Sequence, residues 1–331
     1  MCRLQNIIFP LLLIMAGCNN QDGSAFDELL AEQPYAPLTD SLEKFPNNAD
    51  LFYRRGILLY KNQNYPPAVA DFKKAWELNK KEEYAAALST VYMNGRTDSA
   101  ILFLKQAIKI LPQSIRLKLN LAEAYADKQD YHQALAVTDE ILSAQPNQID
   151  ALILKSDLLD KLNDNNNSLK VLEQAYHLAP FDEDLCYNLA FKYAEQKNEK
   201  VLALCDSLQK ADRLGKKGEP YYFKGLYFSN IGDGVKAISF FNHAILHDYY
   251  YLNAYIEKGK VYFNQNKYPE ALKVFTLVST ISPDFPDAYF WMGKCQEALG
   301  KKNEARLNYQ RAYGLDKTFA EAKEAAERLK D

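Results

Sequence analysis

Residues 252–285 read LNAYIEKGKVYFNQNKYPEALKVFTLVSTISPDF, and this stretch decides the fold. Each half repeats apolar or small side chains every third or fourth residue, which is the spacing of one face of a helix. These positions are Tyr255, Gly259 and Tyr262 in the first half and Ala271, Phe275 and Val278 in the second. Pro283 ends the second helix, because proline lacks an N–H group and clashes with the preceding turn. The stretch predicts two antiparallel helices that approach closely at the glycine and the alanine.

The alanine of the second helix recurs along the whole chain, and we call its positions the ladder. They are Ala68, Ala100, Ala134, Ser168, Leu202, Ala237, Ala271 and Ala305, with steps of 32, 34, 34, 34, 35, 34 and 34 residues. A period near 34 residues is typical of stacked helical hairpins, which usually bind other proteins. Leu202 and Asp206 interrupt the pattern, and one extra residue enters near the charged run 209–217. We expect a bend or local widening there, and a preferred docking point beside it.

The order of aromatic, small residue, aromatic, then Ala-x-x-x-aromatic and proline resembles the tetratricopeptide repeat. The resemblance covers residues 49–319 as about eight repeats, irregular near 199–217, and implies an all-α, right-handed superhelical solenoid. Residues 25–48 are expected to form N-terminal capping helices. Residues 320–331 are expected to form a C-terminal capping helix with a polar outer face, because an array must cover its last apolar surface.

In tetratricopeptide-repeat proteins the first helix of each hairpin lines a concave groove, and the resemblance places aromatic side chains there. The groove residues carried over are Tyr53, Tyr60, Tyr92, Tyr187, Phe191, Tyr222, Phe263 and Phe290. Such a face favours an extended peptide or a helix that docks apolar side chains. The alternative is that neighbouring helices bury these residues. Some family members clamp a C-terminal carboxylate with Lys, Asn and Arg, but Tyr53, Ile57 and Leu119 stand at those positions, so that ligand is not expected.

The N-terminus predicts an export signal over residues 1–17. Its apolar run, residues 7–16, is too short to span a membrane and fits the core of a secretory signal. The sequence Met15-Ala16-Gly17-Cys18 resembles the lipobox of bacterial lipoproteins, whose cysteine is lipidated; an ordinary signal with a chance cysteine is the alternative. The resemblance implies a membrane anchor at Cys18, a polar tether over 18–24, and a location in the cell envelope. The outer membrane is favoured over the inner membrane.

Charge and motifs bear on the remaining classes of function. The chain has 40 Lys and Arg against 43 Asp and Glu, a net charge of −3, which argues against nucleic acid as a partner. G-x-x-x-x-G-K-[ST], G-x-S-x-G and H-E-x-x-H are absent, so we expect no catalytic residue, no cofactor and no metal. Cys186 and Cys205 fall on the two helices of one hairpin, and either a disulfide or two buried thiols fits the sequence.

Two functional classes remain. The first is a lipid-anchored scaffold that binds a protein or peptide partner, for the assembly or regulation of an envelope complex. The alternative is a lipoprotein that captures a small molecule or glycan, as helical-repeat nutrient-binding lipoproteins do with long insertions. The regular spacing leaves room for an insertion only near 209–217, which favours the scaffold.

Overall fold

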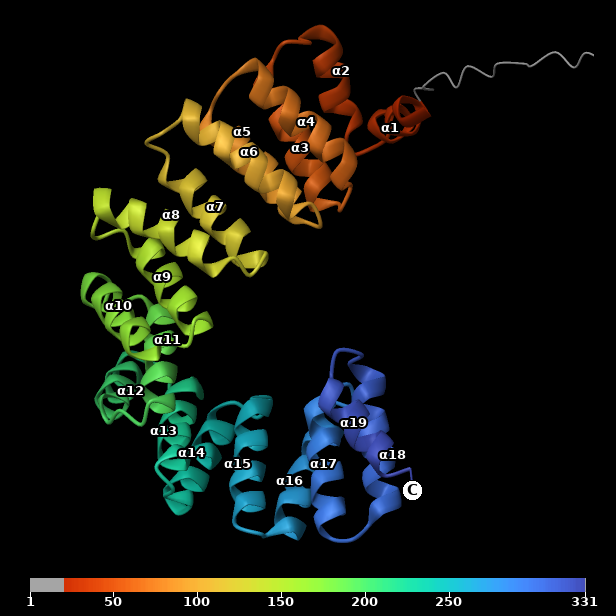
Figure 1. Ribbon diagram of the computed structural model, residues 1–331. Coiled ribbons are helices and arrows are strands. Elements are labelled where there is room, and N and C mark those ends of the chain that lie inside the picture. The colour runs from red at the N-terminus through yellow and green to blue at the C-terminus, as the bar shows by residue number, and fades with distance from the viewer. Residues whose placement is uncertain (1–20, 331) are drawn as a thin grey trace, which may run out of the picture. The chain divides into compact units, whose positions relative to one another are not determined.

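The computed structural model describes residues 21–330, and side chains from residue 26 onward. Within this range the chain forms nineteen helices and no strand (Figure 1). None of these helices is long and apolar enough to cross a membrane. The predicted signal segment and Cys18 lie outside the described residues. The chain divides into two compact units, unit 1 ending at Ile141 and unit 2 beginning at Leu142.

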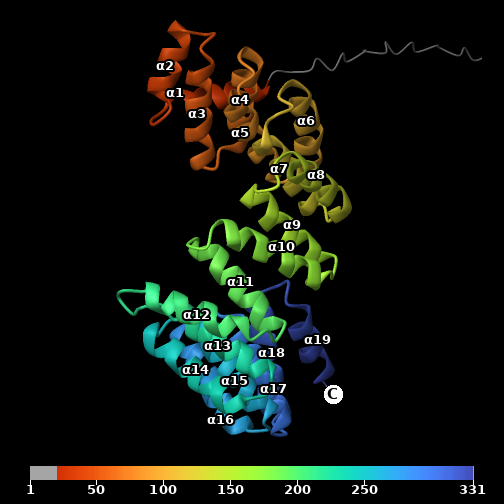
Figure 2. The same ribbon diagram turned by 90° about the vertical axis from the view of Figure 1, so that its left-hand side faces the viewer.

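Unit 1 begins with two single helices that precede the hairpins. The helices are α1 (Gln21–Ala31), α2 (Ala36–Lys44), α3 (Ala49–Lys61), α4 (Tyr65–Leu78), α5 (Glu82–Met93), α6 (Thr97–Ile110), α7 (Ile115–Asp127) and α8 (Tyr131–Ala144), the last of which runs just past the unit boundary. Figure 2 shows α2, α3 and α4 side by side, in agreement with the packing of α3 against both α2 and α4. Helix α1 begins inside the segment 18–24, so the last part of the expected tether is helical.

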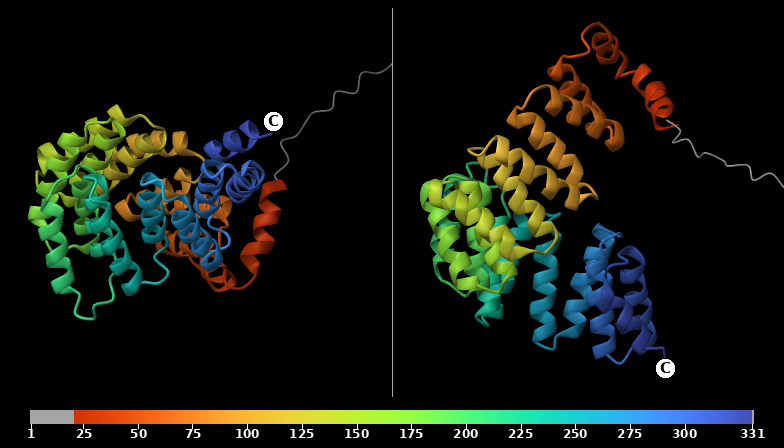
Figure 3. Two further views of the ribbon diagram at one scale, coloured as in Figure 1. Left: turned by 90° about the horizontal axis from the view of Figure 1, so that it is seen from below. Right: turned by 45° about the horizontal axis from the view of Figure 1, so that its top comes forward.

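Unit 2 continues the alternation of first and second helices. Its helices are α9 (Ile149–Lys161), α10 (Asn165–Leu178), α11 (Glu183–Glu195), α12 (Lys200–Ala211), α13 (Glu219–Asn230), α14 (Gly234–His247), α15 (Leu252–Asn264), α16 (Tyr268–Ile281), α17 (Pro286–Ala298), α18 (Lys302–Leu315) and α19 (Ala320–Arg328). Helices α15 to α18 pack consecutively as a row (Figures 1 and 3). The prediction of an all-α array with about eight hairpins is confirmed; its right-handed superhelical path stays a prediction.

Glycine in the first helix is explained by an aromatic ring in the second. A Cβ atom added to Gly259 would lie 2.4 Å from the ring of Phe275, and one added to Gly225 would lie 2.6 Å from the ring of Phe241. Both rings are fully buried. The two helices of a hairpin therefore approach so closely that a side chain at the glycine would displace the ring.

Each hairpin turns through one residue with a left-handed backbone. These residues are Gln63, Gly95, Gln129, Asn163, Lys197, Gly232, Asn266 and Gly300, with φ between 55° and 89°. Each stands five residues before a ladder position predicted from the sequence, so the steps between the turns are the same as those of the predicted ladder. Because the turn is a feature of the local backbone, hairpins with very different side chains can keep nearly the same length.

The fifth hairpin departs from the predicted register at the start of α12. Val201 is fully buried, whereas Leu202 is partly exposed. The N–H groups of Val201 and Leu202 donate to carbonyls three residues back, while the N–H of Ala237 donates to Asp233, four residues back. This first turn has the tighter 3₁₀ hydrogen bonding, which rotates α12 by one residue. The assignment of Leu202 to the ladder was therefore wrong, and Val201 occupies that place.

The two ends of the hairpin series are held by polar contacts. Arg55 on α3 donates from Nη1 to the Thr39 hydroxyl of α2 at 3.0 Å. At the other end, α19 buries Ala322 and Ala326. Arg328 donates from Nη1 and Nη2 to the two carboxylate oxygens of Glu297 at 2.5 and 2.9 Å. These hydrogen bonds hold the pKa of Glu297 below its ordinary value, so the pair is ionised at neutral pH.

Candidate protein-binding surfaces

Two of the predicted groove residues line one cavity in unit 1. Tyr53 and Tyr60 of α3 border a cavity of about 190 Å³, together with Ile57, Thr90 of α5 and Arg116 of α7. These residues come from first helices, whereas Phe72, which also lines the cavity, belongs to the second helix α4. The lining combines rigid aromatic area with a few polar groups, which is the composition of a binding pocket.

Tyr92 does not line this cavity. Its ring packs edge-on against Phe103 of α6, with centroids 6.1 Å apart. Part of the Tyr92 side chain remains accessible. The residue therefore acts first as a packing partner of the second helix in its own hairpin.

The predicted groove residues of unit 2 differ widely in exposure. Phe191 is 46% exposed, while Tyr187, Tyr222 and Phe263 are half-buried. The ring of Phe263 contacts that of Trp291 on the next hairpin, with centroids 5.5 Å apart. Phe191 thus offers the most accessible surface of these four side chains.

Phe290 requires a correction. It is 4% exposed, and its ring lies against Tyr309 and Phe319, with centroids 5.6 and 4.8 Å away. Phe319, which directly precedes α19, covers the face of the Phe290 ring that was expected to be open to a partner. Phe290 therefore belongs to the core of the last hairpin, as the burial alternative states, and is not an accessible docking residue.

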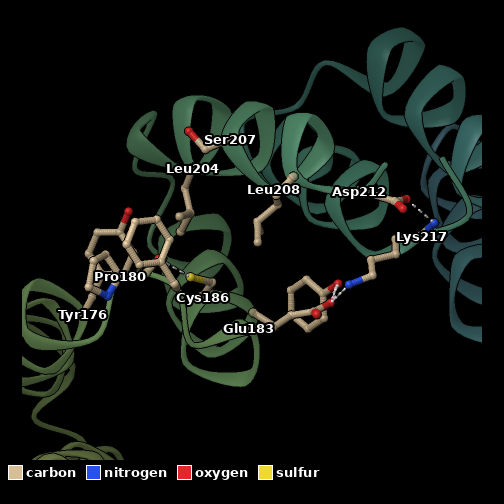
Figure 4. Close-up of a pocket in the computed structure, with 12 residues that line it drawn as sticks. Tyr176, Pro180, Glu183, Cys186, Leu204, Ser207, Leu208, Asp212 and Lys217 are labelled. Carbon is tan, nitrogen blue, oxygen red and sulfur yellow. Dashed lines mark hydrogen bonds and ion pairs between the residues drawn. The ribbon is translucent and has the colours of Figure 1, made fainter. Parts of the chain in front are cut away.

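A larger cavity lies at the fifth hairpin, beside the irregular segment (Figure 4). Its volume is about 390 Å³. The lining residues come from the end of α10, the connection after α10, the start of α11, the last turns of α12 and the connection after α12: Tyr176, Pro180, Phe181, Glu183, Cys186, Tyr187, Leu204, Ser207, Leu208, Ala211, Asp212 and Lys217. Sequence reasoning pointed to this region but did not identify the cavity.

The second helix of this hairpin carries no aromatic ring at the position that faces the first helix. In two other hairpins Phe72 meets Tyr53 at 5.9 Å and Phe241 meets Tyr222 at 6.0 Å. The corresponding buried residue of α12 is Cys205, and those of α6, α8 and α10 are Leu104, Thr138 and Leu172. Four hairpins thus share this feature, so it does not by itself explain the cavity.

Two carboxylates and one ammonium group line the cavity. Glu183 accepts hydrogen bonds from the Tyr187 hydroxyl and from Lys217, and these bonds hold its pKa below the ordinary value. Asp212 accepts the backbone N–H of Lys217 at 2.8 Å, which lowers its pKa in the same way. Burial and the contact with Glu183 raise the pKa of Tyr187 beyond its ordinary range. Both carboxylates are therefore ionised at neutral pH and the tyrosine is neutral.

The described cysteines and His247 pack against other parts of the protein. Cys186, Cys205 and Cys295 are buried and free, so the disulfide alternative for Cys186 and Cys205 is not what the structure shows. Burial raises the pKa of Cys205 to about 12, so its thiol is protonated at neutral pH. His247 stacks on Tyr221 with centroids 4.5 Å apart. Within residues 21–330 no group of three His, Cys, Asp or Glu side chains is placed to hold a metal ion.

Models of the tetratricopeptide repeat match residues 92–158, 149–182, 259–300 and 287–316. The chain therefore contains tetratricopeptide repeats, and this fold supports a role in protein interaction. A crystal structure of a tetratricopeptide repeat protein from Parabacteroides merdae superposes with a TM-score of 0.62 at 19% identity, covering 75% of this chain and 98% of that one. This likeness shows the fold.

Two curated relatives share only repeat segments with this chain. Superkiller complex protein 3 of Homo sapiens is 21% identical over 312 residues, which cover 91% of this chain and 17% of that protein. Protein O-mannosyl-transferase TMTC1 of Homo sapiens is 26% identical over 132 residues, which cover 40% of this chain and 15% of that protein. The chain thus spans less than a fifth of either relative.

Proposed function

We propose that this protein is a non-catalytic scaffold lipoprotein of the bacterial cell envelope, which binds a protein or peptide partner on the aromatic face of its first helices. The observation that carries the proposal is the unit 1 cavity between Tyr53, Tyr60 and Thr90. Tyrosine side chains give large contact area at low entropic cost, and such anchors dominate the energy of many interfaces. The bound partner would be a component of an envelope complex that the scaffold assembles or regulates.

The chemistry of this cavity suits a peptide with one apolar anchor. Tyr53 packs against Phe72 and Tyr84, with centroids 5.9 and 5.1 Å away, so its ring is held in place before binding. Glu83 and Arg116 bring one negative and one positive charge to the lining, so neither sign is favoured. A preorganised apolar cavity with balanced charge favours an uncharged side chain of an extended or helical peptide.

Replacing Thr90 with tryptophan is expected to abolish partner binding without unfolding the array. Thr90 is exposed and lines the cavity, so an indole there fills the space that a partner would use. A photoreactive amino acid at Tyr60 in membranes should give discrete protein adducts, and Thr90→Trp should remove them. Ser99→Trp, on exposed surface of α6, is the matched control and should leave the adducts unchanged. Adducts that persist in Thr90→Trp would show that this cavity is not the binding site.

The anchor is supported by the sequence Met15-Ala16-Gly17-Cys18. Cys18→Ala is expected to move the protein from the membrane fraction to the soluble fraction, because the thiol that would carry the lipid is gone and stable anchoring requires acyl chains. Metabolic labelling with a palmitate analogue should mark the wild-type chain and not the variant. Unchanged fractionation of Cys18→Ala would contradict the lipid anchor and leave the binding proposal intact.

Capture of a small molecule or glycan is the alternative function. Its structural support is the 390 Å³ cavity beside residues 209–217, which falls in the size range of small-ligand sites. A glycan needs many hydrogen-bonding groups, however, and most of the side chains that line this cavity are apolar. Stabilisation of the protein by glycans, together with an absence of protein adducts, would favour the alternative.

A further inference from the structure

Unit 2 exposes large apolar side chains on three successive connections between hairpins. Phe181 follows α10 and is 96% exposed, and Leu214 follows α12 and is 77% exposed. Tyr249 and Tyr250 follow α14 and are 53% and 74% exposed. The connection before these three, residues 145–148, reads QPNQ and carries no large apolar side chain. We call Phe181, Leu214, Tyr249 and Tyr250 the edge residues.

Polar contacts hold the three connections next to one another. Lys217, in the second connection, pairs with Glu183 at the end of the first. His247, at the end of α14, lies with Nδ1 2.5 Å from the carbonyl oxygen of Gly215 in the second connection. The edge residues therefore belong to one continuous side of unit 2, and grouped exposed apolar side chains of this kind mark interaction surfaces.

The 390 Å³ cavity borders the first two of these connections, because Phe181 of the first and Asp212 and Lys217 of the second belong to its lining. Phe181 is also one of the edge residues. The apolar lining consists of Tyr176, Pro180, Phe181, Cys186, Tyr187, Leu204, Leu208 and Ala211. A cavity of this volume admits an aromatic side chain. Apolar surface that continues outside the cavity, at Leu214 and the two tyrosines, extends beyond the reach of a small ligand.

The charge of the lining bears on the kind of residue that would lie beside an aromatic side chain bound in the cavity. Glu183 and Asp212 are both ionised, and Lys217 supplies the one positive charge, so the lining carries an excess of negative charge. Asp182 and Asp184 are the sequence neighbours of Glu183, and Arg213 and Lys216 lie in the connection that carries Asp212 and Lys217. These two negative and two positive charges outside the lining offset one another. The lining therefore favours a cationic group over an anionic one.

We propose that the edge residues and this cavity form a second docking surface, whose occupant is a segment of a partner protein with an aromatic residue next to a basic residue. The aromatic side chain enters the cavity, and the basic side chain meets Glu183 and Asp212. The lining of this surface shares no residue with the groove cavity of unit 1, which α3, α4, α5 and α7 line. The proposal therefore stands or falls independently of groove binding.

Binding of defined peptides to the full chain tests the proposal. The probes are fluorescein-labelled peptides of one length and scaffold that differ only in a central Trp-Lys, Trp-Glu or Ala-Lys pair. By fluorescence anisotropy the Trp-Lys peptide should bind about tenfold more tightly than either of the others, because loss of the anchor or a reversed charge removes a major contact. Equal binding of the three peptides would overturn the proposal.

Filling the cavity supplies the second arm of the test. Ala211→Trp places an indole at the exposed end of α12, in the lining, and should weaken binding of the Trp-Lys peptide about tenfold or more. Ala203→Trp, exposed on the same helix and outside the lining, is the matched control and should bind as the wild type does. Thr90→Trp should also leave this binding unchanged, which separates the surface from the groove.

Other occupants give different results. One such result is that the wild type self-associates in sedimentation experiments, that Ala211→Trp abolishes this association, and that no peptide binds. The occupant is then a second copy of the chain, and the proposal is wrong. If glycans stabilise the wild type but not Ala211→Trp, and no peptide binds, then the cavity holds a small ligand and the proposal is also wrong. Circular dichroism of each variant should match the wild type, and Phe181→Ser, at a fully exposed position, replaces Ala211→Trp if that variant misfolds.

Discussion

Phe275→Ala is expected to lower the free energy of unfolding by about 3–5 kcal/mol, the usual cost of removing a fully buried aromatic side chain. The ring is 0% exposed and stacks on Trp291 of the next hairpin, with centroids 5.8 Å apart. On its other side it fills the space over Gly259, where a Cβ atom would lie 2.4 Å away. Gly259, the α15 residue that faces the ring, has no side chain to fill the resulting hole. The cavity therefore remains, and the variant loses packing both within its hairpin and with the next one.

Urea unfolding measured by circular dichroism tests this expectation, and hydrogen exchange locates the loss. In an array stabilised by neighbouring repeats, the extra exchange should be concentrated in α15, α16 and α17. Tyr250→Ala is the matched control, because this aromatic side chain is 74% exposed and its removal should cost well under 1 kcal/mol. A loss at Phe275 no larger than that of the control would show that the ring does not hold the hairpins together.

The fold was predictable because its determinants are local. The left-handed turn residues recur with the steps of the ladder that the sequence predicts, and each turn requires only its own hairpin. Gly259 and Phe275 illustrate this, since the pair lies within one 34-residue stretch and specifies one close helix contact. Repetition then places eight such units in order.

The features that escaped prediction depend on backbone detail or on distant residues. The sequence does not reveal that the first turn of α12 has 3₁₀ hydrogen bonds, and this turn buries Val201 in place of Leu202. Phe290 is buried because Phe319 covers it, and that residue belongs to the segment after the last hairpin. The family pattern could assign groove positions, but it could not say which of them neighbouring helices cover.

The 390 Å³ cavity lies beside the irregular hairpin, where the sequence predicts a preferred docking point. The irregular step could be read from the spacing of the repeats, but the lining residues could not, because they come from three helices and two connections. The small residue Cys205 does not single out this hairpin either, since Leu104, Thr138 and Leu172 at the same position of other hairpins also carry no ring.

Asp71→Ala is expected to destabilise unit 1 by about 3–5 kcal/mol, because it leaves the buried charge of Arg55 without a partner. The side chains of Arg55 and Asp71 are 9% and 6% exposed. Arg55 donates from Nε and Nη2 to the two carboxylate oxygens of Asp71 at 2.7 and 2.8 Å, and from Nη1 to the hydroxyl of Thr39. Losing Asp71 therefore weakens both the first hairpin and its attachment to α2. Urea unfolding should show the loss, with increased hydrogen exchange in α2 and α3.

The apolar double variant Arg55→Met, Asp71→Leu separates a charge effect from a packing effect. Burial raises the pKa of Asp71, and the hydrogen bonds and charge of Arg55 only partly oppose it, so the carboxylate is costly to keep ionised inside the protein. Removing both charges avoids that cost, and stability should return to within about 1 kcal/mol of the wild type. The exposed pair of Arg54 and Asp50 is the control, since Asp50→Ala should cost at most about 1 kcal/mol. If the double variant is as unstable as Asp71→Ala, the ion pair contributes specific geometry that apolar packing does not replace.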